Sequence, residues 1–376
     1  MLVALAASAV TLIAMSRTQK TGKLEYLENL IQTCFIGESD KTAMEDAAAN
    51  AMIRSLGDRW SYYIPAVQYE THMEQMNNAY VGVGITITQV EGKGFQIESV
   101  EKGGPAENAG MRPGDLITAI DGKDAGEMTL DDAKTLVRGK EDTQVTFTLL
   151  RGEEMLTVPV TRAEVQTVVA SGQMLPGDVG LVTIKNFDAR CAQETIAQID
   201  DLMAQGAKAL LFDVRYNPGG YADEMVKVLD YLLPEGDLFR TLDYRGREDV
   251  DRSDADCITL PMAVLVNVSS YSAAEFFAAT LQEYGAAFVA GEKTVGKGYF
   301  QTTFKLGDGS AVGLSIGKFF TSQGRNLEGV GVIPDLPVPM DEDTAAKLYY
   351  GTLDPREDPQ LQAALERLLE EMNRER

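Results

Sequence analysis

Hydrophobic and polar positions change their spacing several times along the chain, and each spacing predicts a different kind of element. From Leu24 to about Met76, apolar residues recur three and four positions apart, which predicts helices. Between Tyr80 and about Ala163, short stretches of alternating apolar and polar residues predict strands. From Gly180 onward, short apolar runs alternate with helical spacing, an order typical of an α/β domain.

The α/β part can be divided into individual elements. The pattern predicts strands at 179–184, 209–214 and 263–268, helices at 192–205, 222–233 and 273–284, and a hairpin of 301–305 with 311–316. The charged amphipathic stretch 357–376 predicts a last helix.

The first residues have a composition of their own. Residues 2–15 are uncharged and apolar, a length that suits the core of a signal peptide and is short for a membrane span. A buried helix is the alternative. We expect residues 1–16 to be an export signal or membrane anchor, which would place the rest of the chain outside the cytoplasm.

Composition excludes several classes of function. The formal net charge is -23 and is spread along the chain, which argues against nucleic acid or an anionic membrane surface as the main partner. Cys34, Cys191 and Cys257 are far apart and lack C-x-x-C spacing, so we expect free thiols. The only histidine is His72, in a polar helical stretch where a surface position is expected, and this excludes a His-rich metal site. We expect no metal and no cofactor.

One serine lies where a strand meets a helix. Ser272 follows the apolar run 263–268 and precedes the helix at 273–284, where free backbone N–H groups favour developing negative charge. Ser272-Ala-Ala-Glu275 is also a capping box, and the local pattern alone favours that interpretation. The loop lysine Lys297 is flanked by two glycines and followed four residues later by Gln301.

A glycine turn follows another strand. Asn217-Pro-Gly-Gly220 comes directly after the strand at 209–214, and its glycines leave backbone N–H groups exposed. The turn is either an ordinary strand-to-helix connection or half of an oxyanion hole.

The stretch from Gly103 to Gly122 resembles a PDZ domain of the bacterial form, through its sequence G-P-A-x-x-A-G-M-R-P-G-D-L-I-T-A-I-D-G. The resemblance implies that backbone amides around Val83, Gly84 and Ile85 bind the terminal carboxylate of a peptide. The peptide would add as a strand to the exposed sheet edge. Arg138 is a candidate for coupling tail capture to an active site, although most such arginines are surface charges.

Several motifs in a fixed order resemble the C-terminal processing (tail-specific) proteases, which carry a PDZ domain and a Ser-Lys catalytic pair. The motifs are SLGDRWSYYI, the PDZ signature, DVRYNPGG, VLVNVSSYSAAE, GEKTVGKGYFQ and GVGVIPD, and the resemblance covers residues 24–340. The resemblance implies Ser272 as nucleophile, Lys297 as general base and Gln301 as the residue that orients the lysine. It also implies an oxyanion hole formed by amides near Gly219, Gly220 and Ala273.

The resemblance further implies an α/β fold: a crotonase-like α/β protease core with an inserted, mostly β PDZ domain and an N-terminal helical segment. The expected limits are 1–16 for the signal or anchor, 20–78 for the helical segment, 79–163 for the PDZ domain, 164–340 for the protease core and 341–376 for a C-terminal helical segment. Two positions depart from the family pattern. A small residue is usual where Tyr271 stands, and serine is common where Ala274 stands.

A lysine base requires a neutral amine. Its pKa must therefore fall several units from about 10.4 by burial. A neutral Gln301 offers a hydrogen-bond partner, whereas a carboxylate there would raise the pKa of the lysine.

We expect protein or peptide substrates with apolar C-terminal tails, an activating adaptor and a homodimer. Two alternatives stay open: a catalytically idle PDZ scaffold that binds C-terminal tails, and a Ser-Lys hydrolase of small amides or esters. A dinucleotide or P-loop enzyme is excluded because both glycine fingerprints are missing.

Overall fold

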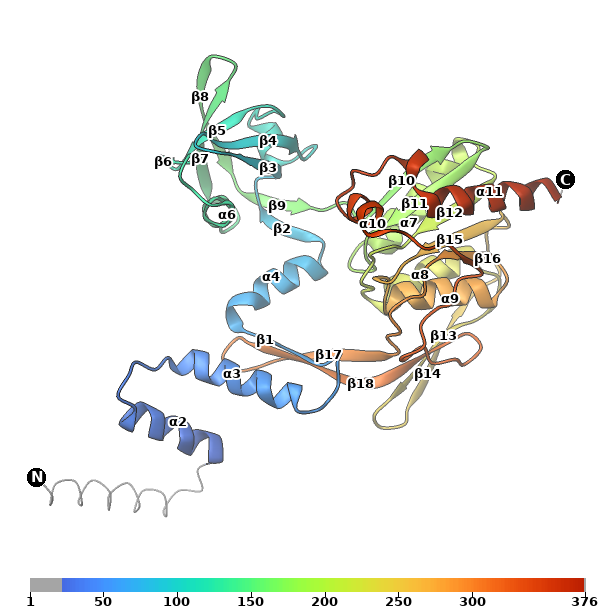
Figure 1. Cartoon of the computed structure of the whole chain (residues 1–376), viewed down its shortest axis with the longest axis horizontal. Helices are drawn as coiled ribbons and strands as arrows, with labels where there is room; N and C mark the ends of the chain where they lie inside the picture. Colours follow the sequence, from blue (N-terminus) through green and yellow to red (C-terminus); the bar gives the residue numbers. More distant parts are fainter. Residues whose placement is uncertain (1–21, 375–376) are drawn as a thin grey trace, which may run out of the picture. The chain divides into compact units, whose positions relative to one another are not determined.

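The computed structural model describes residues 22–374, so the predicted signal or anchor at 1–16 lies outside the described residues. The chain forms two compact units (Figure 1). One contains the residues up to Tyr69 together with Gln301–Ile316, and the other contains Glu70–Phe300 together with the residues from Gly317 onward.

The smaller unit combines helices with strand pairing between distant parts of the chain. Its elements include α2 (Lys23–Cys34), α3 (Lys41–Arg54), β1 (Tyr62–Ile64) and the first part of β18 (Ala311–Thr321). β1 is antiparallel to β18, with Tyr62 opposite Gly313. A Cβ on Gly313 would lie 2.3 Å from the Tyr62 ring, so the glycine makes room for it. The helical prediction for Leu24 to about Met76 missed β1, because the partner of this strand lies far along the chain.

The larger unit contains a separate β module. Its strand order is β3-β4-β5-β7-β8. The elements are β3 (Ile85–Val90), β4 (Gly94–Val100), α5 (Pro105–Asn108), β5 (Leu116–Ile120), β6 (Lys123–Asp124), α6 (Leu130–Val137), β7 (Gln144–Arg151) and β8 (Glu154–Thr161). Phe95, Ile117 and Phe147 are fully buried in a hydrophobic cluster that belongs to this module alone. In the sequence, the module lies between β2 (Ala79–Gly82) and β9 (Ala163–Gln166), which pair with each other as an antiparallel ribbon.

The alternation of apolar and polar residues runs without a break from Val81 to Thr88, but this stretch is not one continuous strand. The chain breaks between β2 and β3 because Gly84 has a φ of +75°. At the break, the carbonyl of the buried Val83 accepts from the Ala106 N–H at 2.9 Å. The glycine therefore starts a loop rather than continuing the ladder.

The second part of the larger unit is built on a six-stranded sheet. Its spatial order is β10 (Ala170–Leu175), β11 (Val179–Ile184), β12 (Ala209–Asp213), β15 (Met262–Val266), β16 (Ala287–Gly291) and β19 (Leu336–Pro337). All neighbours are parallel except β10 and β11. Every residue of β12, β15 and β16 is buried, which explains why these strands are continuous apolar runs in the sequence.

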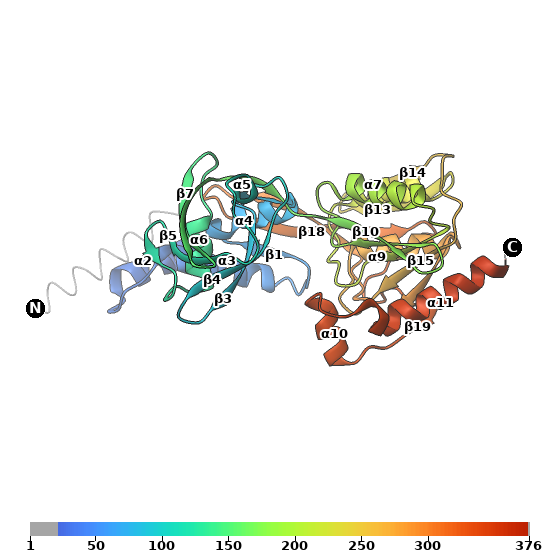
Figure 2. The ribbon, with the colours of Figure 1, turned by 90° about the horizontal axis from the view of Figure 1, so that it is seen from above.

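Helices cover both faces of this sheet (Figure 2). On one face lie α7 (Cys191–Ala204), α8 (Ala222–Leu232) and α9 (Ala273–Glu283), with Phe212 and Val264 beneath them. On the other face, α11 (Pro359–Arg374) packs on Leu211 and Leu265. The sheet thus holds the strand-to-helix turns at the carboxyl ends of its strands, where α/β proteins bind ligands.

Two further strands were not predicted. β13 (Gly236–Asp243) forms a hairpin with β14 (Glu248–Ser253), and the last residues of β18 add to β13. The predicted hairpin of 301–305 with 311–316 is confirmed, because β17 (Tyr299–Lys305) pairs with β18. Because β14 reads Glu-Asp-Val-Asp-Arg-Ser, it lacks the apolar alternation that marks a strand.

The remaining helices are α4 (Ala66–Met76), α10 (Glu342–Tyr349) and the 3₁₀ turn η1 (Pro355–Glu357). Among residues 22–374, no helix combines the length and the apolar character needed to cross a membrane. Cys34, Cys191 and Cys257 are free thiols, as expected.

Candidate active site

Ser272 lies at the turn between β15 and α9 in a strained conformation. Its φ is 60° and its ψ is -128°, and it is only 6% exposed. A non-glycine residue with positive φ costs roughly 1–3 kcal/mol and persists only where the surroundings hold it. Ser270 provides part of that support, because its buried hydroxyl donates to the Val214 carbonyl at 2.7 Å. The Tyr271 N–H donates to the Asn217 carbonyl at 3.1 Å.

Glu275 is a fully buried carboxylate that joins the serine turn to the lysine loop. It accepts hydrogen bonds from the N–H groups of Ser272 at 2.9 Å, Gly296 at 2.7 Å and Lys297 at 2.8 Å, and from the Thr294 hydroxyl. Burial raises the pKa of Glu275, and these four donors oppose that rise. The carboxylate therefore fixes the nucleophile turn and the lysine loop relative to each other.

The predicted capping box is present at the start of α9. The Glu275 carboxylate accepts from the Ser272 N–H, whereas the Glu275 N–H donates to the Ser272 carbonyl oxygen at 2.8 Å.

Lys297 lies in a tightly packed loop after β16. A Cβ on Gly298 would lie 2.6 Å from the backbone nitrogen of Glu328, and Gly296 has a φ of +82°. The Lys297 side chain is half-buried, and its Nζ lies 5.9 Å from the centre of the Tyr271 ring. The structure therefore brings the lysine beside the residue that precedes Ser272.

The glycine turn lies against the serine. A Cβ on Gly219 would lie 2.7 Å from the Ser272 Cβ, and one on Gly220 would lie 2.3 Å from the Phe187 carbonyl carbon. Both positions therefore require glycine. The Gly219 N–H donates to Asn217 Oδ1 at 2.8 Å. Among the described residues, the N–H groups of Gly220 and Ala273 have no acceptor.

Gln301 lies in the smaller unit. There its amide donates to the Ser315 hydroxyl at 3.0 Å. Its predicted role beside Lys297 stays a prediction.

The four residues predicted for peptide binding lie together. Val83, Gly84, Ile85 and Arg138 line one cavity of about 250 Å³ between β3 and α6. Arg138 also forms an ion pair with Glu74 at 2.9 Å. The cavity has a largely apolar wall, which suits an apolar chain end.

Several groups of the site were not predicted from the sequence. Glu275 was considered only as a helix cap, Asn217 only as part of the glycine turn, and Thr294 was not singled out. His72 is half-buried rather than on the surface, and burial lowers its pKa. The available signal for Glu275 was its place three residues after the serine, which does not reveal its burial.

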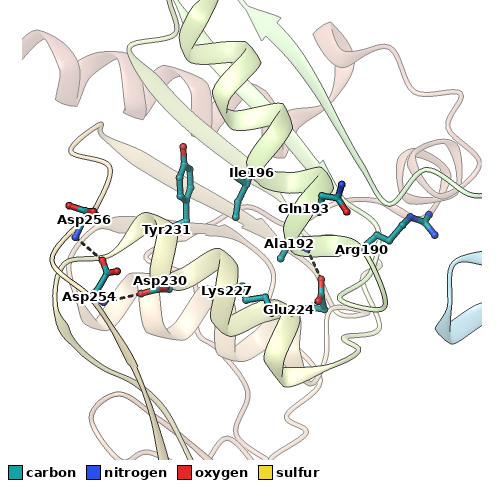
Figure 3. A pocket seen from close by; sticks show the side chains of 10 residues that line it. All are labelled: Arg190, Ala192, Gln193, Ile196, Glu224, Lys227, Asp230, Tyr231, Asp254 and Asp256. Carbon is teal, nitrogen blue, oxygen red and sulfur yellow. Dashed lines mark hydrogen bonds and ion pairs between the residues drawn. The ribbon is translucent and has the colours of Figure 1, made fainter.

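Another cavity lies away from the serine turn. It has a volume of about 610 Å³ and is lined by residues of α7 and α8 and by Asp254 and Asp256 (Figure 3). The Asp254 N–H donates to Asp230 there at 2.9 Å. Ser272 and Lys297 are not among its lining residues, so it offers a place for control substitutions.

Comparison with models of protein families matches residues 178–338 to Peptidase family S41 and residues 96–151 to the PDZ domain. A probable CtpA-like serine protease of Staphylococcus aureus (strain COL) is 32% identical over 320 residues, which are 84% of this chain and 64% of that protein. The chain thus spans less than two thirds of that relative's length.

The carboxy-terminal processing protease CtpA of Bacillus subtilis (strain 168) is 31% identical over 340 residues, or 90% of this chain and 72% of that protein. Among solved structures, the putative S41 protease from Bacteroides fragilis NCTC 9343 has a TM-score of 0.52 at 18% identity and covers 91% of this chain and 96% of that one. This last likeness concerns the fold alone.

Proposed function

The chain belongs to peptidase family S41, among the C-terminal processing proteases with a PDZ domain, and from this premise we propose that it cleaves polypeptides with Ser272 as nucleophile and Lys297 as general base. The observation that carries the proposal is the Glu275 carboxylate. Its oxygen accepts hydrogen bonds from the Ser272 N–H at 2.9 Å and the Lys297 N–H at 2.8 Å, so the backbone of both residues is fixed in relative position. Fixed geometry of this kind is a large source of rate enhancement.

The proposed reaction is acyl transfer. The neutral Lys297 amine takes the proton of the Ser272 hydroxyl as Oγ attacks the scissile carbonyl carbon. The N–H groups of Gly220 and Ala273, which lack an acceptor among the described residues, stabilise the oxyanion. Lys297 then gives the proton to the leaving amine, and a water molecule hydrolyses the acyl-enzyme by the same steps.

Gly219 has a different role in this proposal. Its N–H is already bonded to Asn217, so it contributes by close approach rather than by donating a hydrogen bond. Gln301 is proposed to orient the lysine in the active enzyme.

The PDZ cavity is proposed to bind the C-terminal tail of the substrate. The backbone break at Gly84 supplies the loop for a terminal carboxylate, and Ile85 begins the strand to which a peptide would add. We further propose export to the cell envelope through the apolar run at 2–15, an activating adaptor and a homodimer. Fractionation of expressing cells, with and without residues 2–15, tests the location.

Proteolysis of an unstructured protein with an apolar C-terminal tail tests the function. Wild type should trim it, whereas Ser272→Ala and Lys297→Ala should each lose at least about 10³-fold in kcat/KM. Ser269→Ala and Lys293→Ala change the same residue types in the same two segments and should retain cleavage. If all five proteins bind the tail and none cuts it with adaptors present, the idle PDZ scaffold is correct. Full activity of Lys297→Ala would refute the base.

A further inference from the structure

A buried carboxyl group beside the glycine turn has no described partner. Asp188 follows β11 and is 8% exposed, and its Oδ1 is buried without a hydrogen-bond partner in the described part of the chain. Its backbone N–H donates to Asn186 Oδ1 at 3.0 Å. Because an unpaired buried carboxylate costs several kcal/mol, such a group calls for a ligand or a functional explanation.

Asp188 lines a cavity of about 550 Å³. The wall also includes Asn186, Pro218 and His72. This volume exceeds what one water molecule needs and is sufficient for a long side chain.

The cavity lies next to the reaction site. Phe187, which precedes Asp188, forms a parallel bridge with Gly220, and its N–H donates to the Gly219 carbonyl at 2.7 Å. Pro218 directly precedes Gly219, against which Ser272 packs. The charge of Asp188 also raises the pKa of Tyr271, together with the larger effect of burial.

No described cation that lines the cavity pairs with the negative charge of Asp188. Glu74 and Arg138 pair with each other at 2.9 Å, and Lys185 is exposed to solvent. Burial alone raises the pKa of Asp188, to about 7, and no neighbouring cation opposes it. A cation entering the cavity would therefore gain a carboxylate oxygen, Asp188 Oδ1, to which no group of residues 22–374 donates a hydrogen bond.

We propose that Asp188 forms the recognition group of a substrate subsite that takes a lysine or arginine side chain close to the scissile bond. The long aliphatic stem would fill the cavity beside Pro218, and the charged end would pair with Asp188. The proposal rests on the proposed protease function and adds a specificity for basic residues to it.

The experiment uses internally quenched peptides with one cleavage site and an apolar C-terminal tail. The peptides are compared in pairs that differ at one position near the scissile bond, which is lysine in one peptide and norleucine in the other. Norleucine keeps the aliphatic stem of lysine and removes its charge. Wild type should cleave the lysine peptide at least about tenfold better, in kcat/KM, at one position. Asp188→Asn should lose that preference while retaining cleavage of the norleucine peptide, and Asp188→Glu should retain part of the preference.

Asp256→Asn is the matched control. It removes the same charge from an exposed residue of the other cavity and should keep the preference for lysine. In wild type the preference should also increase from pH 6 to pH 8 as Asp188 ionises, and it should be flat in Asp188→Asn. The other titratable wall groups, His72, Glu74, Tyr80, Arg138 and Lys185, are unchanged in that variant.

The outcomes separate the two proposals. If wild type cleaves no peptide, or no better than Ser272→Ala, the protease function fails. If wild type cleaves but prefers lysine nowhere, or Asp188→Asn keeps the preference, the subsite is refuted. Equal loss on both peptides in Asp188→Asn would make Asp188 a structural residue and also refute it. Asp188→Ser provides a second neutral variant should Asp188→Asn not fold.

Discussion

At the scale of single residues, two buried carboxyl groups show how partners decide the role of a side chain. Glu275 is surrounded by four donors and holds backbone in place. Asp188 has an oxygen without a described donor and lies at a cavity. The same functional group is thus a structural clamp in one place and a candidate binding group in the other.

Replacing Glu275 with glutamine tests the clamp. The amide NH₂ would face backbone N–H donors, so at least one donor loses its acceptor. We expect a loss of about 2–4 kcal/mol of stability and about 10²-fold in kcat, measured by urea unfolding and by peptide cleavage below the unfolding transition. The exposed Glu235→Gln serves as control. Unchanged kcat in Glu275→Gln would show that the clamp does not position the reacting groups.

The pH dependence of stability tests the environment of Asp188. Its pKa is raised from 3.8 to about 7 by burial. Between these values the unfolded chain is ionised and the folded chain is protonated, so the contribution of Asp188 to stability falls as pH rises. Each pH unit in this window costs about 1.4 kcal/mol, and the full penalty is present above pH 7.

Asp188→Asn lacks this penalty. It should be more stable than wild type by about 3–5 kcal/mol at pH 8, with the difference shrinking toward pH 5. Urea unfolding at pH 5, 6, 7 and 8 measures it. The exposed Asp256→Asn should stay within about 0.5 kcal/mol of wild type at every pH. A constant difference between Asp188→Asn and wild type would contradict the raised pKa.

At the scale of elements, the site is formed where chain turns follow parallel strands. The turn at 217–220 follows β12, and the Ser272 turn follows β15, its neighbour in the sheet. The Lys297 loop follows β16, the next strand. Since the carboxyl ends of neighbouring parallel strands meet at one edge, the sheet order assembles the site from three separate segments.

Gly219→Ala tests how closely two of these turns approach. The new Cβ would lie 2.7 Å from the Ser272 Cβ, and the φ of +90° would strain any side chain. We expect at least about 10²-fold lower kcat/KM and a loss of about 1–3 kcal/mol of stability. Gly206→Ala has a similar φ of +100° with open space around it, so it should lose stability and keep activity. If Gly219→Ala and Gly206→Ala were equally active, the close contact between Gly219 and Ser272 would not be needed for catalysis.

At the scale of the whole molecule, the PDZ domain has a hydrophobic core of its own. The chain enters and leaves it through paired residues, Gly82 and Ala163. Antiparallel partners lie about 5 Å apart, so a short linker can replace everything between them.

Replacing residues 83–162 with Gly-Ser-Gly should leave the protease core folded. The variant should cleave an unstructured protein while its discrimination between apolar and charged C-terminal tails falls from about tenfold in wild type to less than about twofold. Competition assays with the two tails measure this ratio, and circular dichroism checks the fold. A preserved tail preference would place tail recognition outside the PDZ domain.

Much of the α/β half was predictable, for a physical reason. Buried parallel strands are short apolar runs, and helices on a sheet show three-and-four spacing, so β11, β12, β15, α7, α8 and α9 are visible locally. The strands β1, β10, β13 and β14 were missed because they are short, polar or dependent on distant partners. In these segments, strand pairing with distant parts of the chain outweighed the local sequence preference for secondary structure.

The sequence by itself determined the family, the order of the domains' signatures and the residue types available for chemistry, because motifs and glycine turns are local properties of the chain. Only the tertiary structure decided which of these groups are buried, which have partners and which meet. It assigned the Gly219 N–H to Asn217, made Glu275 a clamp and left Asp188 facing a cavity. Burial and pairing depend on segments far apart in the chain, and no local pattern records them.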